Sequence, residues 1–363
     1  MPMSPLRANP AGSLTDVHGL LVGHFHRNAR GWRTGTTAII APLGATAGVD
    51  VRGGGPGTRE TDLLRPENLV QQVHGICLTG GSAYGLSAAS GVMQWLESRS
   101  IGFPVGPAAH QIVPIVPAAV IFDLGRGGNF ANRPDDEFGR RAAARAKGLP
   151  EANGAVGAGI GAVAGGLQGG IGSASITLAS GVVVAALAVV NAAGSLIDAS
   201  TGLPWETGAH KLRRPNHRER AALSAATTLV PGVTPPLNTT IGVVATTAQL
   251  SKAECTKVAS VAHDGMARAI RPVHSMFDGD TVFALATGVH QLESTSTDGF
   301  RVEGSRSSLL NQVLDAGALC FAAACTQALL SAVSVGGPPA YLDLCPSALH
   351  TSARPASGHR VSR

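Results

Sequence analysis

The chain has 363 residues, of which 44% are apolar, 14% charged and 4% aromatic, and 47 are glycine. This composition excludes an intrinsically disordered chain, and the length allows one large domain or two smaller ones. The formal net charge is +5, but the basic residues cluster at 210–220 and 354–363 without interleaved aromatic residues. An exposed loop and a solvated tail therefore explain the charge better than a nucleic-acid interface does.

In chain order, short apolar or β-branched runs predict strands, and longer runs with helical spacing predict helices. The predicted elements are strands at 19–23, 36–40 and 73–78, helices at 83–98 and 138–146, strands at 180–190 and 240–245, a helix at 252–270, a strand at 281–287 and a helix at 309–333. Such mixing predicts α/β layers in a single domain at 15–349. Residues 1–14 and 350–363 are expected to be flexible, and residues 202–236 to form an exposed helix and a connector.

The cysteines and the apolar segments indicate a compartment. The five cysteines include no CxxC pair, which is typical of free thiols in a reducing environment. The N-terminal residues lack the apolar core of a signal peptide. The most membrane-like stretch, 316–335, carries several polar residues, so it predicts a buried core helix instead of a membrane span. We therefore expect a cytoplasmic protein with no membrane association.

Several glycine-rich or histidine-containing segments fail the tests for familiar sites. Residues 53–60 lack the Lys-Ser/Thr of a P-loop, residues 157–161 lack the third glycine of a dinucleotide fingerprint, and residues 80–85 miss the nucleophile-elbow spacing. His24 and His26 flank Phe25 on one strand face, and with no third ligand they indicate no metal site. These segments therefore indicate neither a nucleotide site nor a metal site.

The stretch 235–246, PPLNTTIGVVAT, has three competing interpretations. It is a glycosylation acceptor, an ordinary turn into a strand, or a self-cleavage site that makes Thr239 a new N-terminus. A cytoplasmic location disfavours glycosylation. An N-terminal threonine carries a nucleophilic hydroxyl beside its own α-amine, a base with a reference pKa of about 7.7–8.0. Cleavage between Asn238 and Thr239 would therefore place nucleophile and base in one residue.

Amide hydrolysis also needs groups that stabilise the oxyanion and position the nucleophile. Asn191 follows a ten-residue apolar run and reads either as a strand-end cap or as an oxyanion donor. Asp278 and Asp280 flank Gly279 before the predicted strand at 281–287, and they read either as a turn or as carboxylates that hold a protonated α-amine and a hydroxyl. The local sequence leaves both pairs of interpretations open.

Together these residues resemble the P1 peptidase family, also termed peptidase family S58. This family contains self-processing aminopeptidases and amidases, among them D-amino-acid aminopeptidase/esterases, β-peptidyl aminopeptidases and nylon-oligomer hydrolases. The resemblance runs from about residue 14 to about residue 341. It is carried by matching segments in the same order: 51–62, 78–86, 113–117, 169–175, 190–194, 238–243, 263–270 and 277–284.

The resemblance implies a four-layer α/β/β/α sandwich with the architecture of N-terminal-nucleophile (Ntn) hydrolases. It also implies autocleavage into an α chain, 1–238, and a β chain, 239–363. It assigns Thr239 as the nucleophile, Asn191 as an oxyanion contact, and Asp278 and Asp280 as carboxylates beside the nucleophile. The carboxylate pair is most similar to that of the nylon-oligomer hydrolase branch, which acts on 6-aminohexanoate oligomers. Homotetramers of αβ heterodimers without a cofactor or metal are expected.

The same resemblance places Tyr84, Gln168 and Arg140 in the substrate pocket. Gln168 stands where the family often has lysine, and Arg140 where it often has tyrosine. The predicted function is hydrolysis of amide bonds in peptides or oligoamides. Two alternatives stay open: an acyltransferase of the ornithine acetyltransferase type, and a self-cleaved binding protein with weak catalysis because of Gln168 and Arg140.

Overall fold

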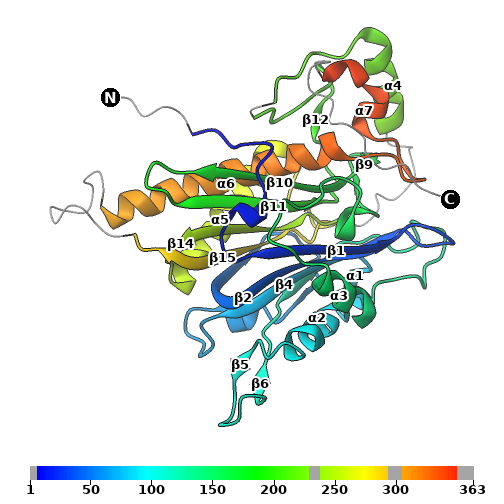
Figure 1. Ribbon diagram of the computed structural model, residues 1–363. Coiled ribbons are helices and arrows are strands. Elements are labelled where there is room, and N and C mark those ends of the chain that lie inside the picture. The colour runs from blue at the N-terminus through cyan, green and yellow to red at the C-terminus, as the bar shows by residue number, and fades with distance from the viewer. Residues whose placement is uncertain (1–5, 209, 229–237, 293–304, 350–363) are drawn as a thin grey trace.

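The computed structural model describes residues 6–208, 210–228, 238–292 and 305–349. The predicted flexible tail at 350–363 therefore lies outside the described residues. Two β-layers form the centre of the molecule and helices cover both outer faces (Figure 1). The long strand β2 (Thr34–Val51) runs through both layers, and its pairing shifts register between Ile40 and Ala45.

Sheet A contains, in spatial order, β10 (Gly170–Thr177), β11 (Val183–Val190), β14 (Ile241–Ala248), β15 (Thr281–His290) and the C-terminal part of β2. Sheet B contains β1 (Leu21–Arg27), the N-terminal part of β2, β4 (Val73–Thr79), β7 (Ala118–Val120) and β3 (Thr58–Arg59). Three two-stranded hairpins complete the strands: β5 (Phe103–Pro104) with β6 (Ile112–Val113), β8 (Val163–Ala164) with β9 (Leu167–Gln168), and β12 (Ile197–Asp198) with β13 (Leu203–Pro204).

The helices divide between the two outer faces. On sheet A lie α5 (Lys252–Ala269) and α6 (Arg306–Ser331), and on sheet B lie α2 (Ala88–Glu97) and α3 (Asp136–Ala144). The short helix α1 (Ser82–Gly85) precedes α2, while α4 (His217–Thr227) and α7 (Tyr341–Leu344) pack on each other at one end of the molecule (Figure 1).

Each strand contributes side chains to two different cores, because successive side chains point to opposite faces of a sheet. This alternation accounts for the four layers. In β14, Val243 and Ala245 belong to the core between the two sheets, whereas Val244 belongs to the core beneath α5 and α6. In sheet B, Ile39 faces the inner core and Ile40 faces the core beneath α2 and α3. Since both faces are buried, the strands are almost continuously apolar. The predicted α/β/β/α sandwich is confirmed.

The element predictions succeed best where the sequence is strongly apolar. The strands near 36–40, 73–78, 180–190, 240–245 and 281–287 and the helices near 138–146, 252–270 and 309–333 are all present with shifted ends. The helix expected at 83–98 is interrupted and forms α1 and α2. Within 202–236, α4 is the predicted exposed helix, and residues 229–236 of the connector lie outside the described residues.

Strand β10 has no counterpart among the predicted elements, because its sequence GIGSASIT is built from small residues. A Cβ at Gly172 would lie 2.1 Å from the carbonyl oxygen of Ala324 and 2.2 Å from the amide nitrogen of Ala328. Helix α6 therefore packs directly on the β10 backbone. The small residues that hide the strand from sequence analysis are the ones that permit this contact.

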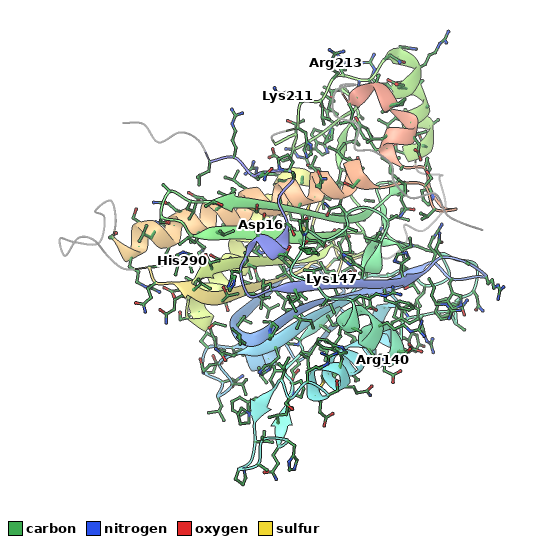
Figure 2. The ribbon with its side chains drawn as sticks, in the orientation of Figure 1. Asp16, Arg140, Lys147, Lys211, Arg213 and His290 are labelled. Carbon is green, nitrogen blue, oxygen red and sulfur yellow. The ribbon has the colours of Figure 1, made fainter. Side chains whose placement is uncertain are left out.

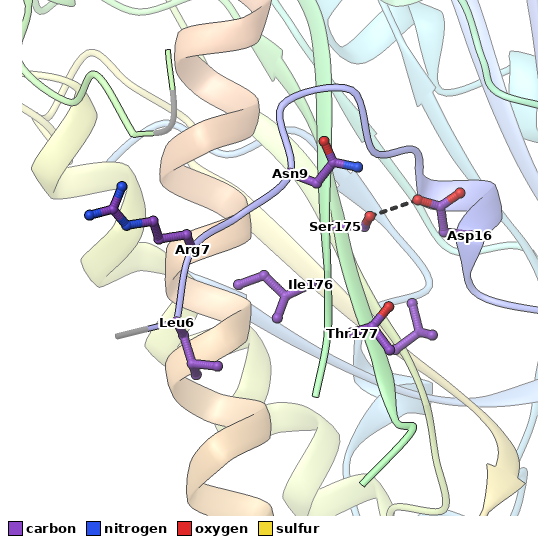
Figure 3. A pocket seen from close by; sticks show the side chains of 8 residues that line it. Leu6, Arg7, Asn9, Asp16, Ser175, Ile176 and Thr177 are labelled. Carbon is purple, nitrogen blue, oxygen red and sulfur yellow. Dashed lines mark hydrogen bonds between the residues drawn. The ribbon is translucent and has the colours of Figure 1, made fainter. Parts of the chain in front are cut away.

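Of the N-terminal residues 1–14, expected to be flexible, residues 6–14 contact the rest of the fold, and residues 1–5 lie outside the described residues. Asn9 pairs with Ser175 of β10, and Ser13 caps a short 3-10 turn at Leu14–Asp16. A pocket of about 520 Å³ lies between this segment and β10, where Ser175 Oγ donates to Asp16 Oδ2 at 2.6 Å (Figure 3). The pocket lies near the Thr177 end of β10. Gly170, at the opposite end of the strand, pairs with Val190 of β11.

Candidate active site

Three sequence-distant segments meet at one edge of sheet A because of its topology. Strands β14 and β15 are parallel and adjacent, joined by the α5 crossover, so both begin at the same edge. Strand β11 is antiparallel to β14, so it ends there. The residues just before β14 and β15 and just after β11 are Thr239, Asp278 to Asp280, and Asn191. The structure therefore brings the four predicted catalytic residues together.

Thr239 is 5% exposed, and the 238–239 backbone bonds to the segments that follow β11 and precede β15. Its amide N–H donates to the carbonyl oxygen of Asn191 at 2.6 Å, and Asn238 donates to Phe277 O at 3.2 Å. The Thr239 hydroxyl makes a very short hydrogen bond to the carbonyl oxygen of Asn238, the residue before it. The hydroxyl is thus held beside the bond that the sequence predicts to be cut.

The two carboxylates are almost fully buried and bind backbone and side-chain donors on either side of Thr239. Asp280 accepts from the Thr240 amide at 2.8 Å, and Asp278 accepts from the Ala193 amide at 3.3 Å. Their remaining oxygens face the turn that precedes β15. They fix the backbone on either side of Thr239, whereas the Thr239 hydroxyl bonds to the carbonyl oxygen of Asn238.

That turn contains two residues that the sequence interpretation missed. The Nδ1 and amide nitrogens of His274 lie 2.8 and 3.1 Å from Asp280 Oδ2, while the amide and hydroxyl of Ser275 donate to Asp278 Oδ2. His274 has a φ of 59°, a left-handed conformation that is costly for a non-glycine residue. A strained residue whose side chain orients a buried carboxylate is typical of functional sites, and it offered no local sequence signal.

Asn191 is completely buried, so its carboxamide needs hydrogen-bond partners within the protein. Its Oδ1 accepts from the Val163 amide at 3.0 Å and from the Arg126 guanidinium, while its Nδ2 donates to Phe122 O over a long 3.4 Å. The carboxamide is therefore oriented through its oxygen. Among the described residues, the bond to Phe122 O is the single one that its NH₂ group makes.

Sequence analysis also missed Arg126, because this residue lies in a glycine-rich loop that matches no motif. Its guanidinium bonds to Gly161 O at 2.7 Å, to Asn191 Oδ1, and to Asn238 Oδ1 at 3.2 Å. It thereby connects the predicted oxyanion residue to the residue at the predicted cleavage point. Burial lowers its pKa to about 10, which still leaves it protonated at neutral pH.

Asp123 lies behind Arg126 and accepts from the Gly81 amide at 2.7 Å. Burial raises the pKa of its carboxyl to about 6, while its hydrogen bonds and the charges of Arg126 and Arg33 act in the opposite direction. The carboxylate is therefore ionised at neutral pH. It compensates part of the positive charge beside the site.

The three residues expected in the substrate pocket occupy different environments. Gln168 is buried, and its Nε2 donates to Ala162 O at 2.9 Å and to Gly169 O at 3.2 Å. Tyr84 is 55% exposed, with the Arg133 guanidinium 3.6 Å from its ring centroid. Arg140 lies on the surface of α3, paired with Glu137 at 2.7 Å (Figure 2). Its ion pair does not connect it with Thr239, Asn191 or the carboxylates.

The structure also bears on metal binding and on the membrane-like stretch of the sequence. Among the described residues, no group of three His, Cys, Asp or Glu side chains is arranged to hold a metal ion. In the same part of the chain, α6 is long and apolar enough to cross a membrane, but 72% of its most apolar window is buried inside the fold. It forms the core of the layer above sheet A, in agreement with the prediction of a core helix.

Comparison with known proteins places this site in context. The family description "Peptidase family S58" matches residues 12–341. An uncharacterised aminopeptidase of Mycobacterium leprae is 47% identical over 364 residues, covering 96% of this chain and 98% of that protein. A 6-aminohexanoate-oligomer endohydrolase of a Kocuria species is 32% identical over 302 residues, covering 80% of this chain and 79% of that protein.

Solved structures share the fold at lower identity. A Burkholderia β-aminopeptidase superposes with a TM-score of 0.66 at 22% identity, covering 95% of this chain and 94% of that chain. An L-aminopeptidase/D-Ala-esterase/amidase of Ochrobactrum anthropi, described as a variant of the Ntn hydrolase fold, gives 0.64 at 22% identity, covering 92% and 89%. The predicted Ntn-like architecture is confirmed by these likenesses.

Proposed function

Because the chain belongs to peptidase family S58, and is therefore a hydrolase of amide or peptide bonds, we propose that Thr239 is its nucleophile and is released by autocleavage. The observation that carries the proposal is the position of the Thr239 hydroxyl, bonded to the carbonyl oxygen of Asn238 at a sheet edge lined by Asn191, Asp278 and Asp280.

Autocleavage begins with attack of Thr239 Oγ on the carbonyl carbon of Asn238. The C–N bond breaks, the acyl group moves to oxygen, and the Thr239 nitrogen becomes a free amine. Water then hydrolyses the ester, which leaves a carboxylate on Asn238 and restores the hydroxyl. The bonds from Asn191 O and Asp280 to the Thr239 and Thr240 amides support this step, because they fix the backbone while the bond is remodelled.

In the mature enzyme the α-amine of Thr239 accepts the proton of its own hydroxyl as the oxygen attacks the substrate amide. The amine then protonates the leaving nitrogen, and water releases the acyl group from the threonine ester. The Asn191 NH₂ group, whose one bond within the described part of the chain is the long one to Phe122 O, turns to the developing oxyanion. Asp278 and Asp280 favour the protonated amine electrostatically.

Intact-mass measurement and N-terminal sequencing test the proposal. The wild-type protein should yield a fragment that begins at Thr239, Thr239→Ala should stay uncut, and Thr239→Ser should be cut. A wild-type chain that remains whole after prolonged incubation, or a fragment with another N-terminus, contradicts the proposed nucleophile. A panel of L-, D- and β-aminoacyl amides beside 6-aminohexanoate oligomers then identifies the substrate class.

The proposal extends to assembly, location and reaction type. A homotetramer of αβ heterodimers gives about four times the chain mass by light scattering, and a smaller mass argues against it. A cytoplasmic location is supported by five free, buried cysteines. If an added amine acceptor receives the acyl group faster than water does, the enzyme is a transferase and the hydrolytic proposal fails.

A further inference from the structure

A second pocket, of about 220 Å³, opens beside Arg126. Its walls come from three segments of the chain, 28–33, 126–127 and 335–336, and they include the side chains of Arg30, Arg33 and Arg126. We call it the arginine pocket. Arg126 both lines this pocket and bonds to Asn191 and Asn238, so the pocket adjoins the candidate active site.

The arginine pocket is positively charged and has an unsatisfied donor. No acidic side chain is among its described lining residues. Burial lowers the pKa of Arg33 and Arg126, and Asp123, which is not part of the lining, attracts both charges and acts to raise the pKa of both. Arg33 is 8% exposed, and within the described residues its buried Nε has no hydrogen-bond partner. A buried guanidinium donor without an acceptor is costly, and an anionic ligand would satisfy it.

The predicted cleavage reaction indicates which part of a substrate the pocket would receive. In autocleavage Asn238 is the acyl residue, and its side-chain Oδ1 accepts from Arg126 Nη2 at 3.2 Å. When a substrate amide takes the place of the Asn238–Thr239 bond, its acyl group points in the direction of the Asn238 side chain. That direction leads to Arg126 and the arginine pocket.

We propose that the arginine pocket is the acyl-group subsite and that it selects acyl groups ending in a carboxylate, such as glutamyl or aspartyl amides and half-amides of short dicarboxylic acids. The inference rests on the proposed function of Thr239 and adds its substrate class. A carboxamide, as in Asn238 itself, offers the same acceptor oxygen without the charge. It is bound more weakly, because charge-assisted bonds to guanidinium are stronger than neutral ones.

The kinetic test compares 4-nitroanilides of glutamate, glutamine and leucine on the self-cleaved enzyme. The expected order of kcat/KM is glutamate, glutamine, leucine, with at least about a tenfold difference between the first and last. Arg30→Gln and Arg33→Gln should reduce the glutamate-to-leucine ratio, and Arg33→Lys should restore part of it. Arg99→Gln, an exposed arginine on the far side of sheet B near Trp95, is the matched charge control.

A binding measurement separates this inference from the proposed mechanism. Calorimetry of glutarate, with pentanamide as the neutral control, reports on the pocket whether or not any anilide is hydrolysed. Glutarate should bind the cut wild-type protein and bind Arg30→Gln and Arg33→Gln at least about tenfold more weakly. If the enzyme hydrolyses the anilides without preferring glutamate, or if glutarate fails to bind, the proposed subsite is wrong. Either result leaves the proposed role of Thr239 unaffected. An uncut chain that still binds glutarate overturns the mechanism instead.

Discussion

The substitution Gly279→Ala tests the placement of the Thr239 hydroxyl with a single methyl group. A Cβ at position 279 would lie 2.9 Å from Thr239 Oγ and 2.7 Å from the carbonyl oxygen of Gly55. Non-bonded contacts of this kind are favourable near 3.5 Å, so the hydroxyl must retreat by about half an ångström. The backbone contact to Gly55 adds an overpacking cost of about 1–3 kcal/mol.

A shift of this size should slow autocleavage by about 10- to 100-fold, because a misplacement of about 1 Å at a reacting atom costs about a hundredfold in rate. That slowing corresponds to about 1.4–2.7 kcal/mol in the barrier. The assay follows the fraction of uncut chain by intact mass over time after refolding. Circular dichroism and thermal unfolding of the same sample establish that the variant is folded.

Gly55→Ala is the matched control, because it lies next to the same turn but its Cβ would meet nothing closer than 3.8 Å. It should cut itself at the wild-type rate. If Gly279→Ala is folded and cuts as fast as the wild type, the hydroxyl position described here is not the reactive one. If Gly55→Ala slows cleavage equally, the effect belongs to the turn as a whole and not to the Thr239 contact.

Three further predictions follow from contacts around the site. His274→Phe removes the side-chain donor to Asp280. This variant should lower kcat by about tenfold or more, since a hydrogen bond to a charged group contributes about 1.5–3 kcal/mol. An unchanged kcat in the cut enzyme argues against a role of His274 in positioning Asp280. Burial lowers the pKa of His263 from 6.5 to about 4, so the unfolded chain takes up a proton first and stability falls as pH drops from about 6.5 towards 4. His263→Gln should flatten the Tm-against-pH curve in that window while the exposed His18→Gln leaves it unchanged, and equal curves for all three proteins refute the assignment. Arg140→Ala should alter kcat/KM by less than about twofold, because surface ion pairs such as Arg140–Glu137 contribute little; a large loss would return Arg140 to the substrate pocket.

Much of the site could be predicted because its residues stand where elements begin and end. The apolar run after Thr240 predicts a buried strand, and Asn191 and Asp280 border runs of the same kind. These residues also lie in segments that resemble those of a known family. A polar residue at the end of a buried strand is easy to find in the sequence, because it stands directly next to a long apolar run.

Strand β10 and the turn at His274 show where sequence reasoning ends. In β10 the small residues that admit α6 remove the apolar signal that identifies a strand. His274 is positioned by a left-handed backbone conformation and by its contact with Asp280. Neither feature is a local propensity, so neither appears in the amino-acid pattern.

The amino-acid pattern was enough to predict the strongly apolar strands and helices of the core, apart from β10, and to place Thr239 just before β14, because these features depend on neighbouring residues. The contacts of Arg126 with Asn191 and Asn238, and the pocket that Arg126 shares with Arg33, appear only in the folded chain. Arg126 follows β7 and Arg33 precedes β2, both in sheet B, so these contacts depend on how sheet B packs against sheet A. The strand order of sheet A acts in the same way on Asn191, Thr239 and Asp280. The parallel β14–β15 pair and the antiparallel β11 bring distant segments to one edge, and no spacing along the chain encodes that convergence.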